Sequence, residues 1–326
     1  LIEEVARIVG YDNLPQIKSN QVSQHYEKSK YDFVNQMKIF MINKGFNEVI
    51  NYSFLDKQSL ENLGLEEKSI SIKNPLNNSL STLRTSLLPS LAANLEFNIN
   101  RGQNFLNIFE IGKSFSNTSS MEALNLAGLI YDDEKFKNWN TNQNYDFFFL
   151  KGLLEDFFEE FRIEKVSWKR SKNVLLHPFA SADIHLNRKL IGSVGSINPS
   201  FLKSLGLNKA FFYFEINIES LPRNDLEKLK APSIYPISQR DFSFEIDKDI
   251  SYDQVTECIH NSSKNFLISS RIFDIYDGQN ISDGKKSIAF RLSWGSDKKT
   301  LSEEDISKEA NLIISGMQEK LNAILR

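Results

Sequence analysis

The chain has 326 residues, of which 40% are hydrophobic and 25% are charged, with 39 Lys and Arg against 42 Asp and Glu. This length corresponds to about two domains, and the composition is that of a folded globular protein. The formal net charge of −3 excludes nucleic-acid binding through overall positive charge, although it leaves room for a local basic patch. The single cysteine, Cys258, excludes a disulfide framework.

The first residues already follow a helical pattern. Apolar residues at positions 1, 2, 5, 8 and 9 form a stripe with helical spacing, which Gly10 and Pro15 end. The first residue is Leu1, and no capping residue precedes the pattern. We therefore expect a piece of a longer chain, in which residues 1–17 are the end of a truncated upstream domain.

Strands outnumber helices in the segment that follows. Helical spacing of apolar residues predicts helices at 31–44, 83–100 and 150–161. Alternating apolar residues and turn signals predict strands at 47–54, 70–72, 105–115, 124–131, 166–170, 182–186, 190–196 and 211–218. Because most of these strands are joined by short turns, we expect an α+β layer structure with an antiparallel sheet.

A charged segment that contains prolines, at 221–233, is the best domain boundary in the chain. Beyond it the pattern predicts a strand at 241–247, a helix at 252–262, strands at 268–277 and 286–294, a helix at 302–319 and a short strand at 321–326. This βαββαβ order is typical of the ferredoxin-like fold, a four-stranded antiparallel sheet with two helices on one face. Cys258 lies on the inner stripe of the first helix and is predicted to be a core residue.

Strand periodicity predicts a polar, open face on this second sheet. In strand 268–277, Arg271, Phe273 and Ile275 share the side that suits the helices, which leaves Asp274 and Tyr276 on the open side. Tyr276 is then the one exposed aromatic residue that we expect on this face. The other residues predicted to face outward are Asp241, Ser243, Glu245, Ser287 and Arg291.

Ordered motifs in both parts of the chain resemble one known family. Four of them are similar to the C-terminal anticodon-binding domain of the bacterial phenylalanyl-tRNA synthetase β subunit, namely Tyr235–Asp241, Phe273–Gly278, Gly284–Leu292 and Lys299–Leu301. Three others resemble the catalytic-like module of that subunit, namely Asn74–Leu76, Leu83–Pro89 and Phe109–Lys113. The segment Leu1–Asn13 resembles the end of the domain that precedes this module.

The resemblance implies a division of the whole chain. The end of the upstream domain is followed by a class II synthetase-like core module at 18–220, the linker at 221–233 and a ferredoxin-fold anticodon-binding domain at 234–326. It also implies a cytoplasmic phenylalanine–tRNA ligase, a tetramer of two α and two β subunits. In that enzyme the α subunit binds ATP and phenylalanine, and the β subunit scaffolds it and binds tRNA-Phe.

The core module lacks the cations that a working class II core uses. Such a core follows its second motif strand with an Arg-x-Glu pair, in which the Arg holds the ATP α-phosphate. Here Phe115 is followed by Ser116, Asn117 and Thr118, and no glycine-rich segment ending in Arg, the third motif of the family, appears later. We therefore expect this chain to be catalytically inactive by itself.

The resemblance also implies which residues contact the tRNA. The anticodon contacts of the family fall at positions that match Ser243, Asp274, Tyr276 and Ser287. Tyr276 is expected to stack on a base and Asp274 to accept hydrogen bonds from a guanine edge. Three basic residues are expected to meet phosphates without reading the sequence: Lys285, Lys286 and Arg291. The alternatives are an ordinary rim position for Tyr276 and, for Arg240 and Asp241, an ion pair within the domain.

A metal site is implied at the other end of the chain. In the family, carboxylates at the positions of Glu3 and Glu4 contribute to a Mg²⁺ ion at the contact with the α subunit, and hard oxygen ligands suit that ion. The Asp that precedes them in the family would lie before Leu1, so we expect an incomplete site in this chain. A solvated helix face is the alternative for the two Glu residues.

Two alternatives from other functional classes stay open. One is a free-standing enzyme with a site in the first module, for which His177, Asp183 and His185 are the candidate acid–base or metal-binding residues. The other is a stand-alone module whose sheet binds a protein or an unrelated RNA.

Overall fold

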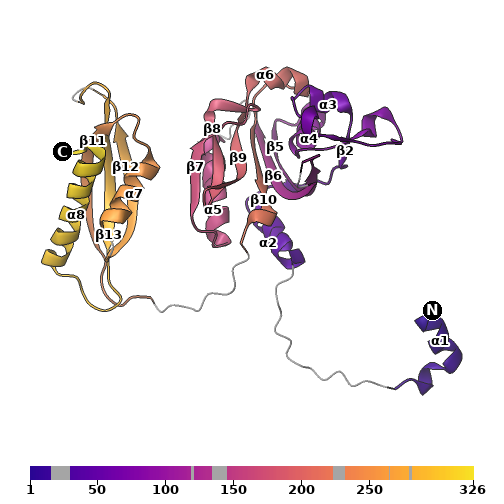
Figure 1. The fold of residues 1–326 in the computed structure, drawn as a ribbon, viewed down its shortest axis with the longest axis horizontal. Coiled ribbons are helices and arrows are strands. Elements are labelled where there is room, and N and C mark those ends of the chain that lie inside the picture. Colours follow the sequence, from indigo (N-terminus) through magenta and orange to yellow (C-terminus); the bar gives the residue numbers. More distant parts are fainter. Residues whose placement is uncertain (16–29, 119–120, 134–144, 223–231, 264, 279–280) are drawn as a thin grey trace. The chain divides into compact units, whose positions relative to one another are not determined.

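The computed structural model describes residues 1–15, 30–118, 121–133, 145–222, 232–263, 265–278 and 281–326 (Figure 1). It divides into two compact units, Leu1–Asn224 and Asp225–Arg326. Both units combine helices with largely antiparallel sheets, so the predicted α+β class is confirmed. In the part of the chain that is described, no helix has the length and apolar character needed to span a membrane.

A seven-stranded sheet forms the frame of the first unit. Its strands, in spatial order, are β1 (Asn47–Glu48), β5 (Phe105–Phe115), β6 (Glu122–Asp132), β10 (Phe212–Asn217), β9 (Lys189–Ile197), β8 (Leu176–Leu186) and β7 (Val166–Arg170). Neighbouring strands are antiparallel, except that β1 runs parallel to β5. The expected antiparallel layer is therefore present.

The predicted strand at 47–54 is divided between two sheets. Its first residues form β1 at one edge of the large sheet, whereas its last residue begins β2 (Phe54–Leu55). A separate three-stranded sheet holds β2, β4 (Thr82–Leu83) and β3 (Ile70–Ser71). Apolar alternation alone does not show where a strand leaves one sheet for another.

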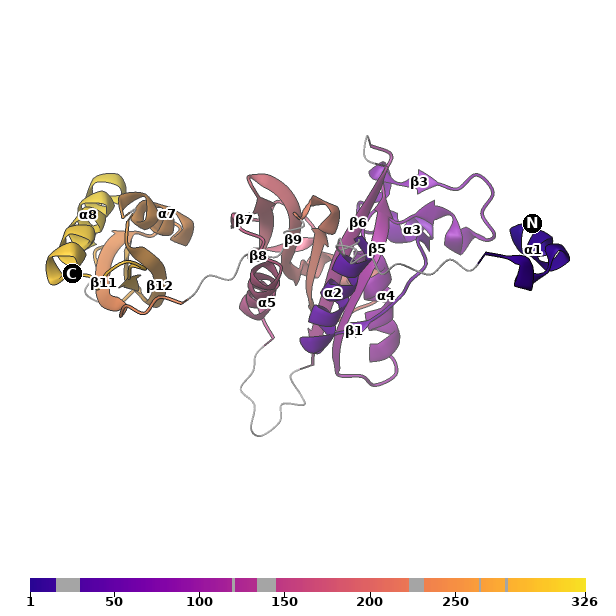
Figure 2. The same cartoon turned by 90° about the horizontal axis from the view of Figure 1, so that it is seen from below.

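Helices cover both faces of the large sheet (Figure 2). Residues of α2 (Lys30–Asn43) and α5 (Phe147–Glu160) pack in one core cluster, and α4 (Leu88–Ile99) packs in the other. The predicted helix at 83–100 begins only at Leu88, because Leu83 pairs within β4. Pro89 occupies the first turn of α4, where its missing N–H needs no partner.

A buried ion pair connects two of the sequence motifs in this unit. Arg84 Nη1 lies 2.7 Å from Glu110 Oε1, and the two side chains are only 2% and 4% exposed. Arg84 Nε also donates to the carbonyl of Lys113 at 2.9 Å, and Asn51 Nδ2 donates to Glu110 at 2.8 Å. A Cβ at Gly112 would lie 2.2 Å from Arg84 Nη2, so glycine there leaves room for the guanidinium.

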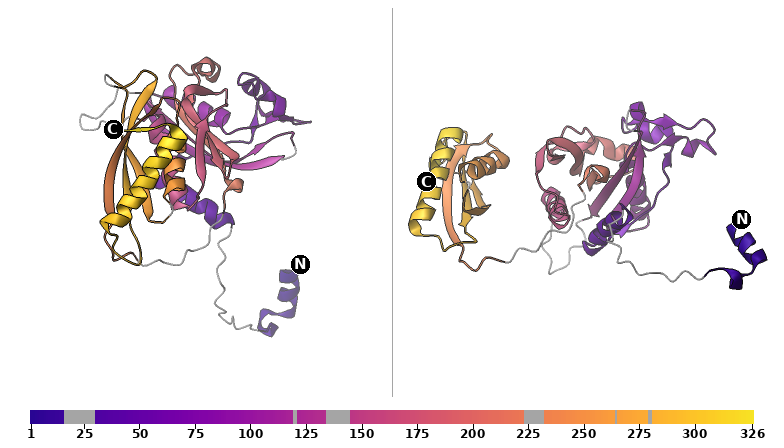
Figure 3. Two further views of the ribbon diagram at one scale, coloured as in Figure 1. Left: turned by 60° about the vertical axis from the view of Figure 1, so that its left-hand side comes forward. Right: turned by 60° about the horizontal axis from the view of Figure 1, so that its bottom comes forward.

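The second unit has the βαββαβ order of the ferredoxin-like fold (Figure 3). Its elements are β11 (Ser238–Asp247), α7 (Tyr252–Ser262), β12 (Leu267–Tyr276), β13 (Lys285–Trp294), α8 (Glu303–Leu321) and β14 (Ile324–Leu325). The sheet order is β12-β13-β11-β14, and every neighbouring pair is antiparallel. Capping boxes at Ser251 and Ser302 begin the two helices.

The helices cover one face of this sheet and share its core. The rings of Phe244 and Phe290 stack with centroids 5.5 Å apart, and Trp294 is fully buried beside them. Cys258 is buried in the same cluster, as predicted, and its thiol donates to the Gly316 carbonyl at 3.3 Å. The two helices therefore leave the opposite face of the sheet uncovered.

Breaking the Arg84–Glu110 pair is expected to destabilise the first unit strongly. Arg84→Met should lower the free energy of unfolding by about 3–5 kcal/mol, because it leaves a buried carboxylate without its cation. Hydrogen exchange of the β5 and β6 amides, read by mass spectrometry, measures the loss within this unit. The matched control is Lys113→Met, which removes the exposed Lys113–Glu122 pair and should cost about 0–1 kcal/mol. Equal protection in the two variants would contradict the prediction.

Candidate nucleic-acid interface

The register of β13 arranges the open face of the second sheet in rows. Side chains directly opposite one another in antiparallel strands point to the same face, and β13 lies between β11 and β12. From one end of the sheet to the other, the rows are Gln239–Ser293–Ser269, Asp241–Arg291–Arg271, Ser243–Ala289–Asp274 and Glu245–Ser287–Tyr276. We call this surface the open face.

Four of the predicted RNA contacts lie together on two neighbouring rows of the open face. Ser243 and Asp274 flank Ala289, and Tyr276 lies directly opposite Ser287. The hydroxyls of Ser243 and Ser287 are 3.1 Å apart. Ser287 is buried, whereas Asp274 is exposed and Tyr276 is 46% exposed. The two serines thus form a polar floor beside one exposed ring and one exposed carboxylate.

The prediction that Arg271 and Phe273 face the helices is wrong. A β-bulge between Ile272 and Asp274 inserts an extra residue, so strict alternation fails within β12. Arg271 pairs with Arg291 on the open face. Phe273 is 54% exposed, and its ring centroid lies 5.8 Å from the guanidinium carbon of Arg291. The open face therefore carries two exposed aromatic rings rather than one.

Ile275 is on its predicted side of the sheet but is more exposed than a core position implies. This residue pairs with Ile288 on the core side, as predicted, yet it is 60% exposed. The reason is that β12 is an edge strand of the sheet, so the helices cover it incompletely.

Of the basic residues predicted to meet phosphates, Lys285 and Lys286 lie on opposite faces of the sheet. Lys285 is on the open face, with Nζ 3.8 Å from Glu245 Oε1. Lys286 pairs with Ile246 on the core side, and its ammonium donates to the carbonyls of Lys248 and Ile250 at 2.8 and 2.7 Å. Lys286 thus binds the turn after β11, and its side chain is not on the open face.

Arg291 is also on the open face, where it is already paired. Its Nε and Nη2 donate to the two carboxylate oxygens of Asp241 at 2.7 and 2.9 Å. These hydrogen bonds hold the pKa of Asp241 below its ordinary value and raise the pKa of Arg291. Arg240 pairs with Glu303 at the start of α8. Arg240 and Asp241 are therefore both in ion pairs within the domain, each with a different partner.

Two further residues contact the segment at and after the end of β12: Glu245 and Gly278. The sequence predictions assign no functional role to either of them. The Glu245 side chain accepts a hydrogen bond from Ser282, which, with the nearby charge of Lys285, lowers the pKa of this carboxylate. Gly278 lies under the ring of Tyr276, because a Cβ on this residue would be 2.5 Å from the tyrosine hydroxyl oxygen. A glycine two residues after an exposed aromatic residue is the signal that was available in the sequence.

The Mg²⁺ expectation at Glu3 and Glu4 finds no complete ligand set in the described part of the chain. Both residues are on α1 (Ile2–Val9), where neighbouring side chains point in different directions. Glu4 pairs with Arg7 at 2.8 Å. No group of three or more His, Cys, Asp or Glu suited to a metal is present among the described residues. These residues alone do not fit a magnesium site.

The candidates for a free-standing enzyme do not assemble into a site. Both carboxylate oxygens of Asp183 are occupied, by the Ser171 hydroxyl and the Lys172 amide. His177 Nδ1 accepts a hydrogen bond from the Phe179 amide at 3.2 Å, so this nitrogen is not bonded to Asp183. The buried Nδ1 of His185 has no hydrogen-bond partner, and no hydrogen bond joins Asp183 to either histidine among the described residues.

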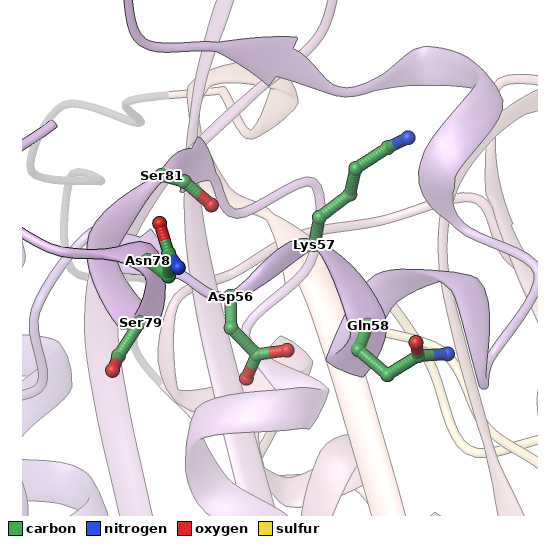
Figure 4. Close-up of a pocket in the computed structure, with 6 residues that line it drawn as sticks. All are labelled: Asp56, Lys57, Gln58, Asn78, Ser79 and Ser81. Carbon is green, nitrogen blue, oxygen red and sulfur yellow. The ribbon is translucent and has the colours of Figure 1, made fainter. Parts of the chain in front are cut away.

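A pocket in the first unit is lined by polar residues, namely Asp56, Lys57, Gln58, Asn78, Ser79 and Ser81 (Figure 4). Asp56 caps the five-residue helix α3 (Lys57–Glu61), and its oxygens accept from the amide and hydroxyl of Ser59 at 2.8 and 2.6 Å. Its carboxylate is therefore used in the cap, so the pocket offers no evident catalytic base.

Two of the comparisons with known proteins, those with family models and with curated proteins, agree on one family. Residues 13–218 match the family model described as phenylalanyl tRNA synthetase beta chain CLM domain, and residues 233–326 match the ferredoxin-fold anticodon binding domain. The chain is 32% identical over 335 residues to the phenylalanine–tRNA ligase beta subunit of Listeria innocua, and 32% identical over 331 residues to that of Legionella pneumophila. Each alignment covers 100% of this chain and 42% of the relative, so the chain spans less than half the length of these relatives.

Among solved structures, the chain resembles PylSc, a pyrrolysyl tRNA synthetase of Desulfitobacterium hafniense. The TM-score is 0.47 and the identity 14%, over 58% of this chain and 64% of that one. At this score and identity, the likeness carries no argument about fold or function.

A methyl group at position 278 is expected to displace the ring of Tyr276. Gly278→Ala should lower the stability of the second unit in the natural sequence but not in a Tyr276→Ala background, with a coupling of about 0.5–3 kcal/mol. A double-mutant cycle of urea unfolding, read by hydrogen exchange of the β11 and β13 amides, measures this coupling. In a Tyr276→Phe background most of the effect should persist, because ring carbon Cζ would also lie 2.6 Å from the new Cβ. Additive effects of Gly278→Ala and Tyr276→Ala would contradict the contact.

Proposed function

Because the chain belongs to the phenylalanyl-tRNA synthetase β-chain family, we propose that it is a non-catalytic part of a phenylalanine–tRNA ligase β subunit that reads the anticodon of tRNA-Phe. The observation that carries the proposal is the open face, where Tyr276 and Asp274 lie exposed on neighbouring rows. The proposed role in protein synthesis places the enzyme in the cytoplasm.

The open face has the groups that sequence-specific recognition of unpaired bases requires. Such recognition combines stacking on aromatic rings with hydrogen bonds to base edges. The exposed ring of Tyr276 offers the stacking surface, and the carboxylate of Asp274 offers an acceptor for the N–H groups of guanine. The hydroxyls of Ser243 and Ser287, 3.1 Å apart, are each able to donate or accept at the base of this site.

Cations around these residues suit the phosphate backbone. Lys285 and Arg291 are on the open face, each close to a carboxylate of the same sheet. Such pairs orient the cations and limit the net positive charge, which favours reading of bases over tight nonspecific binding. We do not include Lys286 in the proposed surface, since its ammonium is bonded to two backbone carbonyls on the other face.

We further propose that the first unit scaffolds the α subunit, which binds ATP and phenylalanine within a tetramer of two α and two β subunits. In β5, which holds the Phe109–Lys113 motif, Glu110 is paired with Arg84 inside the protein. A buried, paired arginine is unavailable to hold a triphosphate. Where Mg²⁺ participates, Glu3 and Glu4 would need ligands from outside the described residues, so we derive no step through the ion.

Removal of the Tyr276 ring is expected to weaken anticodon-dependent binding. With the full chain, Tyr276→Ala should reduce affinity for tRNA-Phe by about 5- to 150-fold, in line with the usual loss of one base stack. Fluorescence anisotropy with labelled tRNA measures the affinity. The matched control is Tyr252→Ala on α7, since Tyr252 is 49% exposed against 46% for Tyr276.

A second tRNA makes this test specific for the anticodon. A tRNA-Phe with a changed first anticodon base should bind the natural chain weakly and respond little to Tyr276→Ala. If both tRNAs bind equally and neither responds to the substitution, the open face is instead a surface for a protein or for unrelated RNA.

We also expect that the chain by itself does not activate phenylalanine with ATP. Incubated with ATP, Mg²⁺ and phenylalanine, the chain alone should show no phenylalanine-dependent exchange of pyrophosphate into ATP. Ser116, Asn117 and Thr118 stand where a working core has its Arg-x-Glu pair, and the buried Arg84 is paired with Glu110. Addition of the α subunit supplies the positive control. Exchange by the chain alone, at a rate that follows phenylalanine concentration, would refute the scaffold proposal in favour of an enzyme.

A further inference from the structure

We propose that Phe273 and Arg271 form a second nucleotide subsite on the open face, in which a base stacks on Phe273 while its phosphate contacts Arg271. The subsite takes the unpaired nucleotide next to the one on Tyr276. It rests on the proposed function and deepens it, since it adds two residues that strand alternation assigns to the opposite face.

The bulge in β12 is the first observation that carries the subsite. Phe273 and Tyr276 are three residues apart, so regular alternation would place only one of the two rings on the open face. With the bulge, Ile272 packs against the core while Phe273 is 54% exposed. Bulges often re-aim a side chain at a functional surface. Here the extra residue lets both Phe273 and Tyr276 reach the open face.

The charges around Phe273 are the second observation. Arg271 is directly opposite Arg291, and like charges opposite one another in a sheet are destabilising. Asp241 neutralises Arg291 with two hydrogen bonds. Arg271 makes no ion pair among the residues that the structure describes. The positive charge of Arg271 is then the one on this row that a phosphate would neutralise, so an anionic ligand fits the row.

The residues that carry the two rings, Phe273 and Tyr276, lie about one row apart along β12. Phe273 is in the bulge opposite Ala289, and Tyr276 is in the next row, opposite Ser287. Neighbouring rows are two residues apart along a strand, or about 6.6 Å. Bases that are splayed out of a loop can therefore occupy the two rings in succession. Stacking does not depend on base identity, so this subsite adds affinity and orientation rather than sequence preference.

A cation lies over the ring on one side. The guanidinium carbon of Arg291 is 5.8 Å from the centroid of Phe273, and the pair with Asp241 holds that guanidinium in place. This contact limits the motion of the ring and leaves it exposed for a base. The arrangement favours a nucleotide as the occupant over an apolar protein side chain, since two arginines border the ring.

The test uses the full chain and an anticodon stem-loop RNA of tRNA-Phe, with 2-aminopurine at either neighbour of the first anticodon base. Phe273→Ala should weaken binding by about 5- to 150-fold and abolish the quenching of one of the two probes. Phe273→Tyr should keep both signals, whereas Phe273→Leu, which keeps apolar bulk without a π face, should lose them. Thermal unfolding of each variant reports whether the domain is folded.

The matched control is Ile275→Ala. Ile275 is in the same strand and is 60% exposed, but it pairs with Ile288 on the other face, so binding and quenching should not change. Arg271→Gln should reduce the slope of log affinity against log salt by about 0.7, the value for one phosphate contact in a single strand.

The outcomes separate this inference from the proposed function. If Tyr276→Ala weakens binding but Phe273→Ala and Phe273→Leu bind and quench as the natural chain does, the second subsite is refuted and the anticodon proposal stands. If Tyr276→Ala has no effect on binding to the stem-loop, the anticodon proposal itself fails. An unchanged salt slope in Arg271→Gln overturns the phosphate contact.

Discussion

The register of β13 is the constraint on which the functional surface depends. This strand pairs with β11 over its whole length and with β12 on its other side, so it fixes which side chains of three strands share a row. A slip of one residue would exchange its faces, carrying Ser287 into the core and Phe290 into solvent. The buried rings of Phe290 and Trp294 make such a slip costly. The same packing that stabilises the domain thus sets the spacing of the groups proposed to meet RNA.

The first unit shows a different use of charged residues. Arg84 and Glu110 are in two of the three motifs that resemble a catalytic-like module, and in the structure they pair with each other inside the protein. The bond from Arg84 to the Lys113 carbonyl ties the segment before α4 to β5, and the bond from Asn51 to Glu110 ties the segment between β1 and β2 to the same strand. A buried pair of this kind specifies how elements fit together, whereas the exposed pairs of the second unit leave charges within reach of a ligand. The proposed division into a scaffold and a reader fits this contrast.

Much of the second unit could be predicted from its sequence, because capped amphipathic helices and alternating strands carry strong local signals. Helix 252–262 is predicted with the bounds of α7, and the inward side of β11 is predicted by its alternating Phe and Ile residues. The orientation of Phe273 could not be predicted, since a bulge depends on pairing with another strand. The partners of Arg291 and Lys286 likewise depend on segments that are distant in sequence. In the first unit, the division of 47–54 between two sheets has the same cause.

The bulge in β12 also bears on the behaviour of the protein at high concentration. An edge strand with exposed Phe273 and Ile275 offers unpaired backbone groups beside apolar side chains, which is the usual template for sheet-to-sheet aggregation. An extra residue disrupts the regular spacing of those backbone groups, and Arg271 adds a charge next to it. A second copy of the chain therefore finds a poor match along this edge. The irregularity that turns an aromatic ring outward also protects the exposed strand from self-association.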